Sequence, residues 1–148
     1  MGPVAPTTPV VLQWTIERTL AASAHVAYVS DESGRNEIYV REFPGGLGTQ
    51  LVSLKGGTAP RWSAKGDELF YVAGDTLMAV SVKLAPRFAA GLPQPLFTAA
   101  KAGLARSEGF SYDVAADGRR FVVVRTLSRP ERHAVVVENW LAKVAAGR

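Results

Sequence analysis

One stretch of the sequence constrains the fold more than any other, residues 58–82, which read TAPRWSAKGDELFYVAGDTLMAVSV. It begins with a short segment that ends at Trp62 and suits a strand, followed by a tight polar turn. Two apolar strands are then expected at Glu68–Ala73 and Thr76–Leu84, because the Gly-Asp pair between them is typical of a β-hairpin. The stretch therefore predicts three consecutive antiparallel strands.

Weaker versions of this pattern lie on both sides of it. Residues 85–95 contain three prolines and predict a loop, and residues 99–107 predict a loop or one helical turn. The segment from Val10 favours a strand over 10–16, although its continuation fits a helix equally well. The other expected strands are 25–30, 36–43, 49–54, 59–62, 96–98, 110–114, 121–125 and 133–140. With ten or eleven short strands and almost no helical segment, the chain is expected to be all-β.

Three of these segments repeat one another: HVAYVS, ELFYVAG and RFVVVRT. Their central residues Tyr28, Tyr71 and Val123 are 43 and then 52 positions apart. A period of roughly 40–50 residues with four strands per unit is typical of propeller blades. The repeat therefore predicts three four-stranded units, with Trp14, Trp62 and Trp140 filling gaps between them.

The segments AYVSDESGRNEIYVREFPG, GGTAPRWSAKGDELFYV and YDVAADGRRFVVV resemble TolB-type, WD-like propeller repeats. They are particularly similar to the last blades of propellers attached to bacterial serine/threonine kinases and related regulators. The resemblance covers roughly residues 26–139, and the Ser-Pro-Asp-Gly turn of that family appears here as Ser63-Ala-Lys-Gly66 and Ala115-Ala-Asp-Gly118. No kinase signature accompanies it, so the resemblance implies the propeller and not phosphoryl transfer.

Three blades are too few to close a ring, and their end faces and edges would be open to aggregation. Two copies would make six blades, so we expect a homodimer with its two-fold axis along the central channel. The strand at 10–16 could complete the last blade, within the chain or across the interface. The alternative is a fragment folded as an open sandwich.

Composition narrows the class of protein. With 47% hydrophobic and 20% charged residues, the chain is expected to be globular, with a flexible leader at 1–8 and one domain at 9–148. The absence of Cys excludes disulfides, thiolate metal sites and a Cys nucleophile. The net charge is +4, but the arginines are dispersed, which makes nucleic acid an improbable partner. No segment resembles a secretory signal or a membrane span, so we expect a soluble, cytoplasmic protein.

The expected blades would gather polar residues at the two mouths of the channel. One mouth would collect Asp31, Glu32, Arg35, Thr58, Asp75, Glu108, Glu131, Arg132 and His133. The opposite mouth would collect Lys65, Asp67, Asp117 and Arg119.

Candidates for chemistry are few. His133 or Glu108 could act as a general base, and Asp113, His133 or His25 could bind a divalent metal ion in the channel. The chain has two His residues and no H-x-H or H-E-x-x-H spacing, so a surface position is the simpler interpretation of both. An acidic residue on an inner strand, such as Asp113, more commonly accepts hydrogen bonds from the backbone of a neighbouring blade than binds a metal. Glu108 is interpreted in the same way. No cofactor is firmly implied.

These observations favour a non-catalytic interaction or ligand-sensing module that acts as a homodimer and binds an unidentified protein or small molecule. The alternative is a metal-dependent hydrolase of phosphate esters, with its site in the channel of the dimeric propeller.

Overall fold

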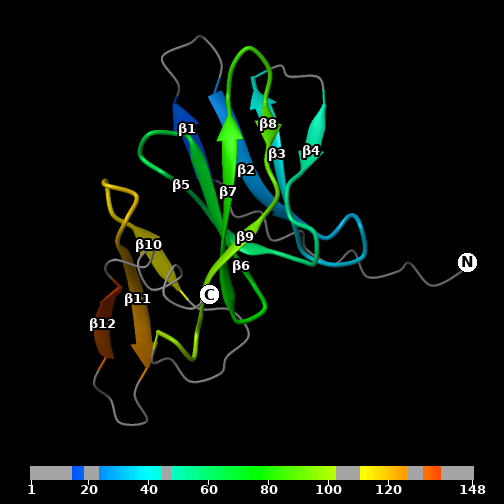
Figure 1. The fold of residues 1–148 in the computed structure, drawn as a ribbon. Coiled ribbons are helices and arrows are strands. Elements are labelled where there is room, and N and C mark those ends of the chain that lie inside the picture. Colours follow the sequence, from blue (N-terminus) through cyan, green and yellow to red (C-terminus); the bar gives the residue numbers. More distant parts are fainter. Residues whose placement is uncertain (1–14, 19–23, 45–47, 103–110, 127–131, 138–148) are drawn as a thin grey trace, which may run out of the picture.

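The computed structural model describes residues 15–18, 24–44, 48–102, 111–126 and 132–137 (Figure 1). These residues form twelve β-strands and no helix, which confirms the all-β prediction. The expected leader at 1–8 lies outside them. The strands are β1 (Thr15–Arg18), β2 (Ala24–Ser30), β3 (Glu37–Phe43), β4 (Thr49–Leu51), β5 (Thr58–Trp62), β6 (Glu68–Ala73), β7 (Thr76–Lys83), β8 (Ala89–Ala90), β9 (Gln94–Thr98), β10 (Tyr112–Val114), β11 (Phe121–Thr126) and β12 (Arg132–Val137).

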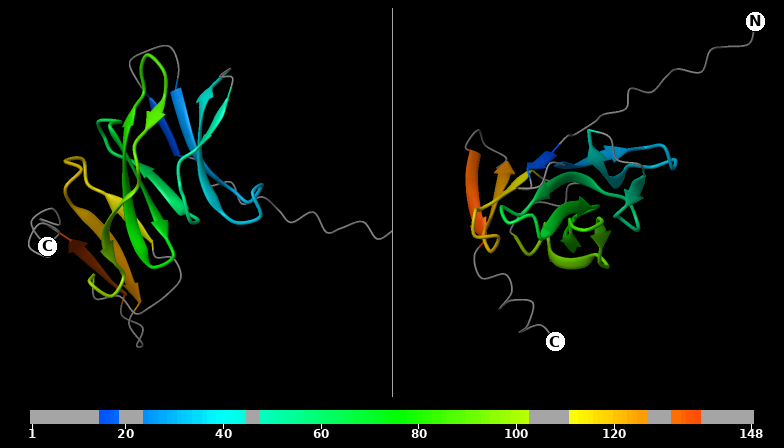
Figure 2. Two further views of the ribbon diagram at one scale, coloured as in Figure 1. Left: turned by 45° about the vertical axis from the view of Figure 1, so that its right-hand side comes forward. Right: turned by 90° about the horizontal axis from the view of Figure 1, so that it is seen from above.

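The strands form three antiparallel sheets, none of which is closed. The first sheet has the order β1-β2-β3-β4, and the third has the order β10-β11-β12. In the second sheet β5, β6 and β7 are neighbours, and both β8 and β9 pair with β7. Figure 2 shows the three sheets following one another in the order of the sequence. Four strands per unit were expected. The first sheet has four, the second has five, and the third has three described strands.

Two predictions about strands are wrong. The loop expected at 85–95 contains β8 and the beginning of β9, because the main chain after β7 folds back until the Gly91 N–H donates to the Ser81 carbonyl at 2.8 Å. The N-terminal strand does not complete the last unit. Its described part, β1, pairs with β2, with Ile16 opposite Val26, and therefore belongs to the first sheet.

Two hydrophobic cores lie on the two faces of the second sheet. Between the first and second sheets, Ala27 and Val29 pack with Leu69 and Tyr71. Trp62 belongs to the same core, as predicted for a gap filler, while Trp14 and Trp140 lie outside the described residues.

Between the second and third sheets, Phe70 and Val72 pack with Phe121 and Val123. The rings of Phe70 and Phe121 meet edge to face, with their centroids 5.0 Å apart. Successive residues of a strand point to opposite faces of the sheet. Both faces of β6 are buried, and this explains why its sequence is a continuous apolar run.

The strand register supports the repeat alignment. Trp62, the last residue of β5, lies opposite Leu69, and Val114, the last residue of β10, lies opposite Phe121. Two positions later in β6 and β11, Tyr71 and Val123 each face the preceding sheet. The equivalent residue of β2, Tyr28, lies on the face of the first sheet turned away from the second, since its neighbours Ala27 and Val29 face the second sheet.

Within the described ranges, no helix has the length and apolar character needed to span a bilayer.

Candidate binding site

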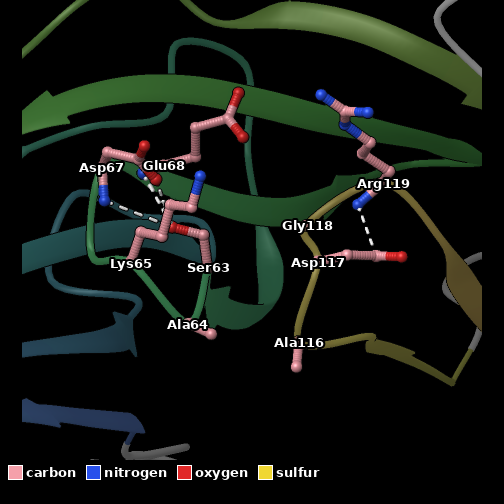
Figure 3. Close-up of a pocket in the computed structure, with 9 residues that line it drawn as sticks. All are labelled: Ser63, Ala64, Lys65, Asp67, Glu68, Ala116, Asp117, Gly118 and Arg119. Atoms are coloured by element: carbon pink, nitrogen blue, oxygen red, sulfur yellow. Dashed lines mark hydrogen bonds between the residues drawn. The ribbon is translucent and has the colours of Figure 1, made fainter.

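A pocket of about 180 Å³ lies between two polar turns, one from the second sheet and one from the third (Figure 3). The first turn joins β5 to β6 and the second joins β10 to β11. Four of the lining residues are Lys65, Asp67, Asp117 and Arg119, the set that the sequence places at one mouth. The structure therefore confirms that these four residues, 54 positions apart at their extremes, share one site. The lining is completed by Ser63, Ala64, Glu68, Ala116 and Gly118.

The two turns have the same main-chain hydrogen bonds. In the first, the Ser63 N–H donates to the Glu68 carbonyl at 2.9 Å, and the Gly66 N–H donates to the Ser63 carbonyl at 3.0 Å. In the second, the Ala115 N–H donates to the Arg120 carbonyl at 2.9 Å, and the Gly118 N–H donates to the Ala115 carbonyl at 2.8 Å. Both glycines have positive φ, +72° and +67°, a conformation that side chains disfavour. The turn positions therefore correspond one to one.

The side chain that caps each turn differs. In the first turn the Ser63 hydroxyl accepts hydrogen bonds from the N–H groups of Asp67 and Glu68, at 3.2 and 3.1 Å.

In the second turn Ala115 stands at the position of Ser63 and has no hydroxyl. There the Asp117 carboxylate accepts from the equivalent N–H groups, those of Arg119 and Arg120, at 3.0 and 3.3 Å. The two equivalent N–H groups of each turn thus have a side-chain acceptor, but it comes from a different turn position in each case.

The acidic side chains at the pocket are not equally available. Asp67 accepts a hydrogen bond from the Ser63 hydroxyl at 2.8 Å, and Asp117 forms an ion pair with the Arg120 guanidinium at 2.8 Å. Hydrogen bonds from the Arg119 N–H and then from Arg120 hold the pKa of Asp117 below its usual value. Glu68 differs, because burial and then the nearby charge of Asp67 raise its pKa.

The two cationic side chains of the lining, Lys65 and Arg119, form no ion pair with any residue that the structure describes. Figure 3 shows Glu68 and Arg119 on opposite sides of the gap, with their charged ends extending the same way, while the Asp117 carboxylate points away from the gap. The pocket therefore offers one carboxylate and one guanidinium on facing rims, together with the ammonium group of Lys65.

Two separate contacts involve connections that carry residues predicted for the opposite mouth. The β2–β3 hairpin meets the β4–β5 connection, where the Gly57 N–H donates to the Asn36 carbonyl at 2.8 Å and Arg35 donates to the Leu54 carbonyl at 3.2 Å. The Ala99 N–H donates to the carbonyl of Asp75 at 2.7 Å, which joins the β6–β7 hairpin to the residues after β9. Asp31 and Glu32 lie in the first of these hairpins. Glu108 and Glu131 lie outside the described residues, as do the side chains of Arg132 and His133.

Glu37, at the start of β3, is a buried charge that the sequence does not reveal. It is 2% exposed and forms an ion pair with Arg35 at 2.5 Å. Its second oxygen accepts hydrogen bonds from the Ser53 hydroxyl and, at 2.9 Å, from the Gly56 N–H. Burial would raise its pKa, but the hydrogen bonds from Ser53, Arg35 and Gly56 and the Arg35 charge outweigh burial and lower it.

The predicted catalytic and metal-binding candidates are not brought together where they are described. Asp113 is exposed on β10 and accepts a hydrogen bond from the Val114 N–H at 2.8 Å, rather than from a neighbouring sheet. His25 lies in the first sheet, and the surface position expected for it is wrong, because the residue is 5% exposed and its ring packs on Phe88. His133 lies opposite Arg125 in the β11–β12 register. Among the described residues, no three His, Asp or Glu side chains group so as to hold a metal ion.

Comparison of the chain with protein-family models and with curated proteins finds no match.

Proposed function

We propose that this protein is one half of a β-propeller of the TolB-like kind, and that it acts as a homodimer. In this proposal three sheets of one copy and three of the other form a ring of six. The function is non-catalytic: the assembly binds a ligand or partner through the turns at its mouths. The observation that carries the proposal is the repetition of one interface between successive sheets.

The two observed interfaces use equivalent residues. Ala27 and Val29 of β2 face Leu69 and Tyr71 of β6, and Phe70 and Val72 of β6 face Phe121 and Val123 of β11. The same rule applied once more pairs Val122 and Val124 of β11 with Val26 and Tyr28 of β2. Within one chain these last two faces point away from each other, at the two ends of the stack (Figure 2).

Exposure on the end face of the third sheet fits this rule. Val124 is 46% exposed, whereas its equivalent in the second sheet, Val72, is buried. The difference arises because β6 has a sheet packed on each side, whereas among the described residues β11 has a sheet packed on one side.

The end face of the first sheet also has exposed apolar residues. Phe43 is 55% exposed, whereas the equivalent residue of β7, Val82, is 6% exposed. Leu51 shares this face and is also exposed, and the rings of Tyr28 and Tyr39 stack there with centroids 5.8 Å apart. Val26 is already buried within the chain, so a second copy would contact the Tyr28 side of the face.

A second copy is the occupant that satisfies both end faces at once. Each chain carries both halves of the missing interface, so a two-fold axis would form two identical contacts and leave no end sheet open. Open sheet faces and edges otherwise promote uncontrolled association. No contact between described residues favours the metal-dependent hydrolase.

The mass in solution tests the homodimer. We expect about twice the chain mass of 15.8 kDa by light scattering, and a shift toward the monomer in Val124→Asp. Lys83→Gln, an exposed change on β7, serves as the control and should stay dimeric. A wild-type mass of one chain at every concentration would overturn the proposal.

The absence of Cys allows a second, geometric test. Tyr28→Cys and Val124→Cys are made as separate proteins, mixed and oxidised. The mixture should give a disulfide-linked pair of chains, because the proposed contact joins residue 28 of one copy to residue 124 of the other. Neither variant alone should form this product to the same extent, since the two-fold axis keeps identical positions apart. Equal cross-linking in the single variants would contradict this geometry.

A further inference from the structure

We propose that the pocket between the two equivalent turns binds a small zwitterion, namely a free amino acid or short peptide. Its carboxylate would meet Arg119 and its ammonium group would meet Glu68. This inference rests on the ligand-binding part of the proposed function and names the class of ligand. It does not depend on the second copy, because both turns belong to one chain.

The charged side chains of the pocket differ in whether they already have a partner. Five charged side chains line the pocket, three acidic and two basic. Asp117 is paired with Arg120, and Asp67 accepts from the Ser63 hydroxyl. Glu68 has neither kind of partner among the described residues, and Arg119 has no ion pair there. Lys65 has no ion pair there either, so one negative and two positive groups remain, and of these Glu68 and Arg119 lie on facing rims (Figure 3).

Neither an anion nor a cation alone matches this lining. An anion alone would meet Arg119 and Lys65 but would leave Glu68 without a partner in a pocket that also holds the Asp67 carboxylate. A cation at Glu68 would leave the Arg119 fork unmatched. A zwitterion provides a partner for both Arg119 and Glu68. The guanidinium binds its carboxylate with two parallel hydrogen bonds, and the Glu68 carboxylate accepts a hydrogen bond from its ammonium group.

Two further features of the site support a small ligand of this kind. Ala64, Ala116 and Gly118 contribute little side-chain bulk to the lining, and the volume of about 180 Å³ suits a molecule no larger than a short peptide. The pKa of Glu68 is raised by burial and by the charge of Asp67. An ammonium group beside Glu68 would offset that repulsion and favour the ionised carboxylate.

The test is a titration of the intact protein with candidate ligands at pH 7, in which binding is measured from changes in the amide chemical shifts. The probes are glycine, glycylglycine and triglycine, which place the two charges at increasing separation, with acetate and methylammonium as single-charge controls. We expect at least one zwitterion to bind at least about tenfold more tightly than either control and to shift amides of both turns. Glu68→Gln and Arg119→Gln should each weaken that binding by about tenfold or more, since each removes a charge-assisted hydrogen bond. Lys83→Gln, outside the pocket, should leave it unchanged.

The result that overturns the inference is binding of none of the three zwitterions, or equal binding of acetate or methylammonium. Equal weakening by Lys83→Gln would also overturn it. The mass of the same samples separates the two proposals: a monomer that binds removes the homodimer alone, and a dimer that does not bind removes the zwitterion site alone.

Discussion

The hydroxyl of Tyr112 donates a hydrogen bond to the main-chain carbonyl of Ala59, with 2.8 Å between the two oxygens. The bond joins the third sheet to the second. Ala59 has a positive φ of +52° and lies where the β5–β6 register shifts, between Thr58 and Arg61. A regular strand would direct this carbonyl into its own ladder, so Tyr112 satisfies a group that the irregularity sets free.

Tyr112→Phe is therefore expected to lower the free energy of unfolding by about 1–2 kcal/mol, because it leaves the partly buried Ala59 carbonyl without this partner. Urea denaturation measures the loss. Ser33→Ala is the control, since that hydroxyl donates to the Arg35 carbonyl at 3.3 Å on the surface, and it should cost less than about 0.5 kcal/mol. Equal losses in the two variants would contradict the assignment.

Tyr71 makes stability sensitive to alkaline pH. Burial, and then the charge of Glu37, raises the pKa of Tyr71 from 10.0 to about 12. The folded protein therefore holds this proton more tightly than the unfolded chain. The resulting stability is fully present below pH 10 and is lost as the pH rises through the folded pKa.

Tyr71→Phe removes this linkage. Between pH 9 and pH 11 the wild-type protein should lose about 1 kcal/mol more stability than the variant, measured by urea denaturation at both pH values. An identical pH dependence in the two proteins would show that Tyr71 does not titrate differently on unfolding.

The equivalence of the two turns predicts that an Asp at position 65 can partly replace the Ser63 hydroxyl. Ser63→Ala should cost about 1–2 kcal/mol, because the N–H groups of Asp67 and Glu68 lose their acceptor, whereas Ala115→Ser should change stability by less than about 0.5 kcal/mol. Adding Lys65→Asp to Ser63→Ala should restore part of the loss, since Lys65 occupies the turn position of Asp117. Thermal or urea unfolding of the four proteins measures this. No recovery in the double variant would mean that the turns are not interchangeable.

The elements that could be predicted from the sequence are those that a local pattern determines. The apolar run in β6 and the Gly-Asp hairpin that follows it fix three strands, and these were predicted within one or two residues. The strand order expected for the repeated units also predicted that Lys65 and Arg119 lie at the same mouth, and both line one pocket. Equivalent turns of adjacent repeats must lie side by side once the sheets stack.

Prediction from the sequence failed where the partner is distant and chemically unmarked. Glu37 is buried because Ser53 and Gly56 reach it from the β4–β5 connection, and nothing in EIYVREF indicates this. His25 is covered by Phe88, which follows β7 in the second sheet. The strand at Ala89–Ala90 has no β-branched residue, and pairing with Val82 and Lys83 is what makes it extended.

Glu37 predicts a loss of stability in acid. Its pKa is lowered from the ordinary value of 4.5, so the folded state favours the carboxylate. This stability is present above pH 4.5 and is lost as the pH falls through the folded pKa. Glu37→Gln should cost about 2–3 kcal/mol at pH 7 and distinctly less at pH 3. Glu32→Gln, exposed in the neighbouring hairpin, should show no such effect. An equal cost of Glu37→Gln at both pH values would contradict the role of the charge.

His25 leads to a prediction of the opposite sign. Its ring lies 5.6 Å from that of Phe88, tilted by 32°, and its Nδ1 has no hydrogen-bond partner among the residues that the structure describes. A buried nitrogen without a partner costs free energy, and an aromatic ring of similar shape would avoid that cost and keep the contact with Phe88. His25→Phe is therefore expected to stabilise the protein by about 1 kcal/mol in urea denaturation, whereas His25→Asn, which keeps a polar group and loses the ring, should destabilise it. Destabilisation by both variants would mean that the imidazole has a partner that His25→Phe removes.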